Sequence, residues 1–148
     1  MFIISTCLAG LHCRYDGGTK PDERVMRLVA QGKAIPVCPE QLGGLPTPRL
    51  PAEQVGDRVV NREGVDVTAQ FHRGAQEALQ IARLAGATEA ILKARSPSCG
   101  SGSVYDGTFT NRLVEGDGVF ARLCKENGIP VRSEEEIVRY FPPPDALK

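Results

Sequence analysis

Four of the five cysteines lie in loops rich in glycine, proline and polar residues, where a thiol can do chemistry. Cys7, Cys38 and Cys99 each lie at the end of a predicted strand or in the loop just after it, and Cys13 follows Cys7 by six positions. Thiols are soft ligands for zinc and iron–sulfur clusters, and a thiol in a polar loop can also act as a nucleophile. The fifth, Cys124, lies on the apolar face of a predicted helix and is expected to be a small core residue.

The spacing of these cysteines matches no common metal motif. The chain has no Cys-x-x-Cys pair of the kind found in zinc ribbons and ferredoxins. The topology is more informative, because the carboxyl ends of parallel strands meet at one edge of a sheet. Thiols from separate strand ends would converge there and could hold zinc or an iron–sulfur cluster. The plain alternative for any one of them is a buried core thiol.

Polar side chains accompany the cysteines and could supply the remaining chemistry. Glu40 follows Cys38 by two positions, and a carboxylate beside a metal site is a candidate general base. Ser96 and Ser98 lie just before Cys99 and could orient a ligand or relay a proton. A carboxylate in such a loop can equally cap backbone amides, so this pattern alone leaves both roles open.

Two cations lie at the same strand ends and loops. Arg49 ends a proline-rich stretch, and Lys93 ends a predicted strand. Both could contact a bound substrate, but Arg49 can also organise its loop and Lys93 can be a solvated strand end. No glycine-rich phosphate-binding loop is present, so a nucleotide site is not indicated.

Short apolar runs alternate with segments of helical periodicity, which predicts an α/β fold. We expect a small, open, mostly parallel sheet with helices on both faces and cysteine-bearing loops at the carboxyl ends of the strands. The expected strands cover 2–6, 34–38, 58–61, 89–93 and 130–132, and the expected helices cover 21–31, about 66–85, 119–126 and 133–141.

A single domain over residues 1–141 is predicted, followed by a C-terminal tail over 142–148 that begins with three prolines. A chain of 148 residues has the size of one ordinary domain. Two stretches, 39–56 and 94–110, are predicted to be long loops. Long loops inside a compact domain are usually functional.

The composition argues against several classes of protein. Lys+Arg and Asp+Glu are 18 each, so the basic excess of a nucleic-acid binder is absent. Aromatic residues make up only 5% and Trp is absent, which disfavours base-stacking platforms. We expect no signal peptide from the first residues, and no apolar run reaches roughly 18 residues, the length of a membrane span. We therefore expect a cytoplasmic protein with reduced thiols, and a monomer by default.

Taken together, the motifs resemble those of a small bacterial family that was long catalogued as a domain of unknown function and includes thiouracil desulfidases. The resemblance covers the chain from Ile4 to about Glu134. The stretches that carry it are, in order, Cys7-Leu8-Ala9-Gly10-Leu11-His12-Cys13-Arg14-Tyr15-Asp16-Gly17, Cys38-Pro39-Glu40, Gly43-Gly44-Leu45-Pro46-Thr47-Pro48-Arg49, Gly64-Val65-Asp66-Val67-Thr68, Lys93-Ala94-Arg95-Ser96-Pro97-Ser98-Cys99-Gly100 and Tyr105-Asp106-Gly107-Thr108-Phe109.

The resemblance implies an iron–sulfur domain with one [4Fe–4S] cluster held by three cysteines. The fourth iron, free of protein, would bind the sulfur of a small thiolated pyrimidine such as 4-thiouracil. The implied reaction is not a redox reaction: the thiocarbonyl becomes a carbonyl and sulfide leaves. The resemblance favours Glu40 for activating water and Ser96 for orienting the ring or relaying a proton.

Residue assignments within this site are hypotheses. Cys7, Cys38 and Cys99 are the expected ligands because each follows a separate strand, and Cys13 would then be a nearby thiol that assists sulfur release. A ligand set that includes Cys13 is the alternative. The remaining expected substrate contacts are Ser98, Arg49 and Lys93.

Three other functions stay open. The site could remove sulfur from a different thiolated compound. It could be a cluster- or zinc-binding sensor or carrier without turnover. It could also transfer sulfur through a cysteine persulfide without any metal, in which case activity would survive in a metal-free preparation.

Overall fold

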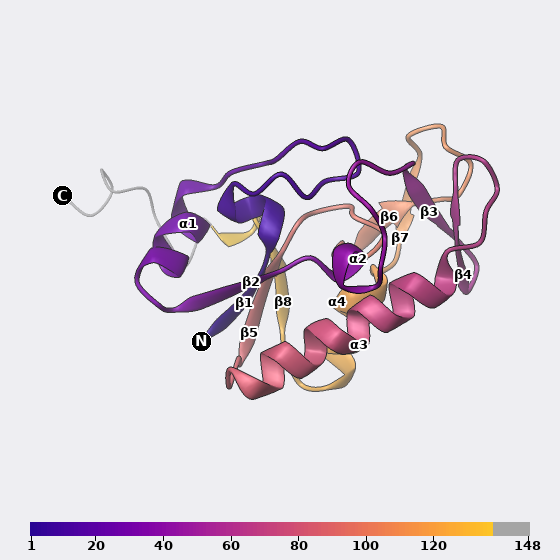
Figure 1. Cartoon of the computed structure of the whole chain (residues 1–148). Helices are drawn as coiled ribbons and strands as arrows, with labels where there is room; N and C mark the ends of the chain where they lie inside the picture. Colours follow the sequence, from indigo (N-terminus) through magenta and orange to yellow (C-terminus); the bar gives the residue numbers. More distant parts are fainter. Residues whose placement is uncertain (138–148) are drawn as a thin grey trace.

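Four short apolar strands form a parallel sheet at the centre of the fold (Figure 1). The computed structural model describes residues 1–137. In spatial order the strands are β2 (Ala34–Val37), β1 (Phe2–Ser5), β5 (Glu89–Leu92) and β8 (Val131–Ser133). All three neighbouring pairs are parallel. The predicted α/β class and parallel sheet are confirmed.

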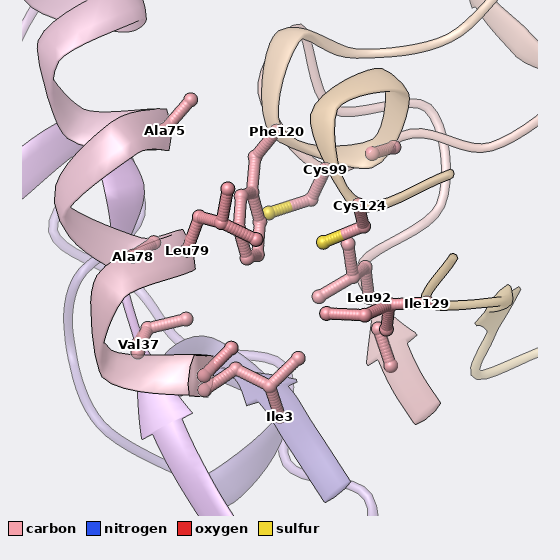
Figure 2. Packing of buried hydrophobic residues seen from close by; sticks show 13 residues of the cluster. Ile3, Val37, Ala75, Ala78, Leu79, Leu92, Cys99, Phe120, Cys124 and Ile129 are labelled. Atoms are coloured by element: carbon pink, nitrogen blue, oxygen red, sulfur yellow. The ribbon is translucent and has the colours of Figure 1, made fainter. Parts of the chain in front are cut away.

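Helices cover both faces of this sheet, as the nearly continuous apolar strands require. One face packs against α3 (Thr68–Leu84) and α4 (Val119–Glu126). Figure 2 shows the Phe120 ring of α4 beside Leu79 of α3 in this cluster, which also includes Ile3 of β1. The next residue, Ile4, points to the opposite face, where it joins the cluster formed with η1 (Thr6–Ala9) and α1 (Glu23–Ala30).

A short helix, α2 (Pro39–Leu42), lies against the N-terminal half of α3. Two glycines permit this contact. A Cβ atom on Gly74 of α3 would lie 1.7 Å from the Pro39 carbonyl oxygen, and one on Gly43 would lie 1.9 Å from the Gln70 carbonyl oxygen. Such distances are impossible for real atoms, so the backbones approach this closely only because both positions are glycine.

Two small antiparallel hairpins complete the fold. One pairs β3 (Ala52–Val55) with β4 (Arg58–Asn61), and the other pairs β6 (Ser103–Tyr105) with β7 (Leu113–Glu115). Figure 1 shows them together at one end of the molecule, with the parallel sheet towards the other. The Gln54 side chain joins β3 to the neighbouring loops by donating to the carbonyl oxygens of Pro97 at 3.1 Å and Asp117 at 2.8 Å.

The prediction of two long loops is partly wrong. The stretch 39–56 contains α2 and β3, and the stretch 94–110 contains β6. These elements have four or three residues each, too few to show a period. Contacts with other elements stabilise them: β3 pairs with β4, β6 pairs with β7, and α2 packs on α3.

The predicted helix over 133–141 does not begin as expected within the described residues, where Ser133 ends β8 and residues 134–136 form a turn. The polar contacts expected of its capping box are made by this turn: the Ser133 amide donates to Glu136 Oε1 at 3.1 Å, and the Glu135 amide donates to Ser133 Oγ at 3.2 Å. Residues 138–141 and the predicted boundary with the tail lie outside the described range. No helix within residues 1–137 is long and apolar enough to span a membrane.

Candidate functional site

A cavity of about 660 Å³ opens at the carboxyl ends of the sheet strands. Its volume falls in the range of small-molecule sites, roughly 300–1,000 Å³. Most of the side chains predicted to be functional line it, namely Cys7, Cys13, Cys38, Glu40, Arg49, Lys93, Ser96 and Cys99. Segments that are more than ninety positions apart in sequence, as Cys7 and Cys99 are, thus meet around one space. Ser98 is not among the lining residues.

Three of the thiols contact one another directly. The Cys13 thiol hydrogen-bonds to the thiols of both Cys7 and Cys38. These bonds stabilise the thiolate forms of the two outer residues, lowering the pKa of Cys38 to about 7 and the pKa of Cys7 below its ordinary value. The Lys93 ammonium also lowers the pKa of Cys7. The pKa of Cys13 is raised for the reciprocal reason.

Cys99 approaches the cavity from the hydrophobic core. Burial raises the pKa of its thiol, and a hydrogen bond with the Ser5 side chain opposes that effect. Figure 2 shows its side chain in the same cluster as Phe120 and Cys124. Cys124 is completely buried and does not line the cavity, and burial raises its pKa to about 12. The prediction that Cys124 is a core residue is confirmed.

Glu40 is placed by α2 and held by Arg49. Glu40 Oε2 accepts from Arg49 Nε at 2.8 Å and also from Nη2. The same guanidinium donates to the Cys13 carbonyl oxygen at 3.0 Å, to the Pro46 carbonyl oxygen at 3.2 Å and to Thr47 Oγ1 at 3.1 Å. All five N–H groups of this side chain are therefore engaged, and only 8% of it is exposed. No hydrogen bond from the described residues reaches Glu40 Oε1.

Lys93 is fixed from behind by Glu134. Its ammonium lies 2.7 Å from Glu134 Oε1, and the other carboxylate oxygen, Oε2, accepts from the Ala94 amide at 3.0 Å. Both side chains are mostly buried. The lysine predicted as a solvated strand end or a substrate contact is thus an anchored charge at the edge of the cavity.

The two serines differ in placement. Ser96 lines the cavity, and its oxygen accepts from the amides of Ser98 at 3.2 Å and Cys99 at 3.0 Å, which leaves its hydroxyl hydrogen for another acceptor. Ser98 is 1% exposed, and its Oγ is the one buried side-chain polar atom without a partner within residues 1–137.

The sequence did not predict the wall of the cavity that lies opposite the parallel sheet. This wall comes from the two hairpins and includes Glu53, Arg62, Tyr105 and Asn111. A signal was available for the first hairpin, because Gly56-Asp57 between two short runs is a typical two-residue hairpin turn. Nothing comparable marks the second hairpin, whose strands have only three residues each.

A cavity at the carboxyl ends of a parallel sheet, lined by thiols and a carboxylate, is typical of an α/β enzyme. Sequence comparison agrees with this class. Residues 2–136 match the model of the 2-thiouracil desulfurase family, and the chain belongs to that family. The predicted resemblance is confirmed.

Two relatives are informative. The chain is 42% identical over 147 residues to YbbK of Bacillus subtilis (strain 168), described as an uncharacterized protein, with 93% of this chain and 97% of that protein covered. A solved structure described as the [4Fe-4S]-dependent thiouracil desulfidase TudS (DUF523Vcz) superposes with a TM-score of 0.89. It is 45% identical, with 93% of each chain covered.

Proposed function

We propose that the protein is a [4Fe–4S]-dependent desulfidase that converts 4-thiouracil, or a related thiolated pyrimidine, to the oxo base. The observation that carries this proposal is the convergence of four thiols and Glu40 on one cavity. The relative with a solved structure, 45% identical, is described as a [4Fe-4S]-dependent thiouracil desulfidase, which supports the same cofactor and substrate class.

The residues around the cavity fit such a cluster. Four reduced thiols line one space, and the lowered pKa of two of them favours the thiolate form that binds metals. We propose Cys7, Cys38 and Cys99 as ligands because they follow β1, β2 and β5, which are adjacent in the sheet. Cys13 is the alternative third ligand, since its thiol contacts two of these. When bound, the cluster would supply Lewis-acid chemistry toward the sulfur of a thiocarbonyl group.

Glu40 is the proposed general base. One carboxylate oxygen is held by Arg49, which leaves Oε1 to take a proton from a water molecule in the cavity. The water oxygen attacks the thiocarbonyl carbon, the new C–O bond forms and the C–S bond breaks. Both water protons leave with the sulfur as hydrogen sulfide, so the reaction needs no electron donor or acceptor.

Ser96 is the proposed proton relay. Its oxygen already accepts two amide hydrogens, so its own hydroxyl hydrogen is directed to another acceptor. Such a donor at the cavity wall can protonate the sulfur or orient the ring.

The geometry supports proposals for the remaining side chains. Arg49 has no free N–H, so we propose that it positions Glu40 and does not bind substrate directly. Lys93 stays a candidate substrate contact. Ser98 does not line the cavity, so a role there would be indirect. We propose a cytoplasmic monomer. Because acidic and basic residues are equal in number, we propose that it acts on a free small molecule and not on nucleic acid.

The test is anaerobic reconstitution with iron and sulfide, followed by incubation with 4-thiouracil. Loss of the thiocarbonyl absorbance and release of sulfide are followed together. We expect turnover that requires the cluster and is lost in E40Q. A stable cluster without turnover would favour a sensor or a different thiolated substrate. Equal activity in metal-free protein would favour persulfide chemistry.

A further inference from the structure

Glu53 is a buried carboxylate in the wall of the cavity opposite the sheet. It lies on β3, lines the cavity and is only 8% exposed. Its bonds all reach one oxygen: Oε1 accepts from the amides of Gly107 at 3.0 Å and Phe109 at 3.1 Å. Within residues 1–137 it forms no ion pair with a lysine or arginine.

Burying a carboxylate without a cation is unfavourable unless hydrogen bonds satisfy it. Only half of this carboxylate is satisfied, because no bond from the described residues reaches Oε2. In the same part of the chain, Ser98 Oγ is the one fully buried side-chain polar atom without a partner, so Oε2 keeps some solvent contact. Since Glu53 lines the cavity, Oε2 is an acceptor available from inside it.

The loop over residues 106–112 is shaped to hold this carboxylate in place. Phe109 has a φ of 59° and Asn111 a φ of 61°, a backbone conformation that residues other than glycine rarely adopt. In this conformation two backbone amides of the loop donate to Glu53 Oε1. The Arg62 guanidinium lies over the Phe109 ring, 5.8 Å from the ring centre. Strained backbone of this kind concentrates at functional sites.

We propose that Glu53 is a specificity residue that accepts a ring N–H of the substrate. This inference rests on the proposed function and names the class of compound: a cyclic thioamide that carries at least one N–H. 4-Thiouracil, for example, has one N–H group at N3, beside the thiocarbonyl, and a second at N1, across the ring from it. A bond from N–H to a carboxylate is charge-assisted and stronger than a bond between two neutral groups.

The test compares binding of 4-thiouracil with binding of its N1-methyl and N3-methyl forms. The reconstituted protein carries E40Q so that the ligand is not consumed, and Glu53 is either retained or changed in E53Q. The amide side chain introduced by E53Q keeps a carbonyl oxygen for the two backbone amides but places an NH₂ group where Oε2 was. E63Q is the matched control, because Glu63 is exposed and does not line the cavity.

With Glu53 retained, one of the methylated forms should bind about tenfold or more weakly than 4-thiouracil. In E53Q that preference should largely disappear, while E63Q should keep it. The preference is the ratio of two affinities measured on the same variant, that for 4-thiouracil and that for its methylated form. Partial loss of folded protein therefore does not change it. An unchanged preference in E53Q, or equal binding of all three compounds with Glu53 present, would overturn the proposal. Tight binding without sulfide release from the enzyme with Glu40 would instead contradict the proposed function.

Discussion

Arg49 shows how one side chain can unite a site built from distant segments. Its guanidinium connects the loop carrying Cys13, the helix carrying Glu40 and its own loop at Pro46 and Thr47. Its backbone amide also donates to the Tyr15 carbonyl oxygen at 2.7 Å. Lysine cannot replace this planar set of five donors, because its ammonium has three donors at one point.

R49M is therefore expected to lower kcat by about a hundredfold, as misplacement of a catalytic base does. R49K should recover only part of the loss. Added guanidinium ions should partly rescue R49A, which a general loss of structure would not allow. Steady-state kinetics at matched iron content checks this, and wild-type kcat in R49M would contradict the positioning role.

The four cavity thiols differ in their expected response to substitution. Replacement of Cys7, Cys38 or Cys99 by alanine should abolish stable iron binding, because three ligands are needed and each follows its own strand. C13A should keep the iron, and C124A is the control because Cys124 lies in the core and does not line the cavity. Iron content and the cluster absorbance measure this. Loss of iron in C13A with retention in C99A would assign the third ligand to Cys13.

At the scale of elements, the contact between α2 and α3 sets the position of the proposed base. Helix propensity alone predicts that G74A stabilises α3 by roughly 0.5–1 kcal/mol. The Cβ atom would, however, lie 1.7 Å from the Pro39 carbonyl oxygen, which forces α2 and Glu40 to shift. We expect G74A to lose about 1–3 kcal/mol of stability together with activity, as overpacked sites do. A denaturant titration that showed a more stable variant would contradict this packing.

Asp22 caps α1 and makes its stability depend on pH. Its carboxylate accepts from the amides of Arg24 at 2.9 Å and Val25 at 3.4 Å, and it pairs with the Arg24 guanidinium at 2.6 Å. Burial raises its pKa, but these bonds outweigh that effect and the pKa lies below 3.8.

A carboxylate with a depressed pKa stabilises the fold above its ordinary pKa and loses that effect as the pH falls through its folded value. D22A should therefore cost about 1 kcal/mol near neutral pH, typical of a lost cap, and progressively less below the ordinary value of 3.8. Chemical denaturation of both proteins across this pH range is the measurement. A cost that stays constant down to the lowest pH would be inconsistent with the cap.

The elements with strong patterns were predictable and the short ones were not. The strands of the parallel sheet are apolar runs, and α3 carries a clear helical stripe, so their positions follow from local sequence. By contrast, β6 and β7 form only because they pair with each other across a seven-residue loop. The position of α2 depends on the close approach of its backbone to α3 at Gly43 and Gly74, which no local pattern predicts.

At the scale of the whole molecule, the sheet order explains why the site could be anticipated. Three cysteines follow strands that lie side by side, so the rule that parallel strands end at one edge was enough to bring them together. The same rule could not reveal Glu53, which reaches the cavity from a hairpin outside the parallel sheet. Nor could it show that every N–H group of the Arg49 side chain bonds to an acceptor of the protein, because these acceptors come from three separate segments.

The proposed reaction exchanges sulfur for the oxygen of water without a change in oxidation state. The most direct measurement is a reaction of the reconstituted protein with 4-thiouracil in oxygen-18-labelled water, without added reductant. We predict one sulfide for each uracil formed and the heavy isotope in the new carbonyl. Sulfide release that required a reductant, or uracil without the label, would contradict the proposed reaction.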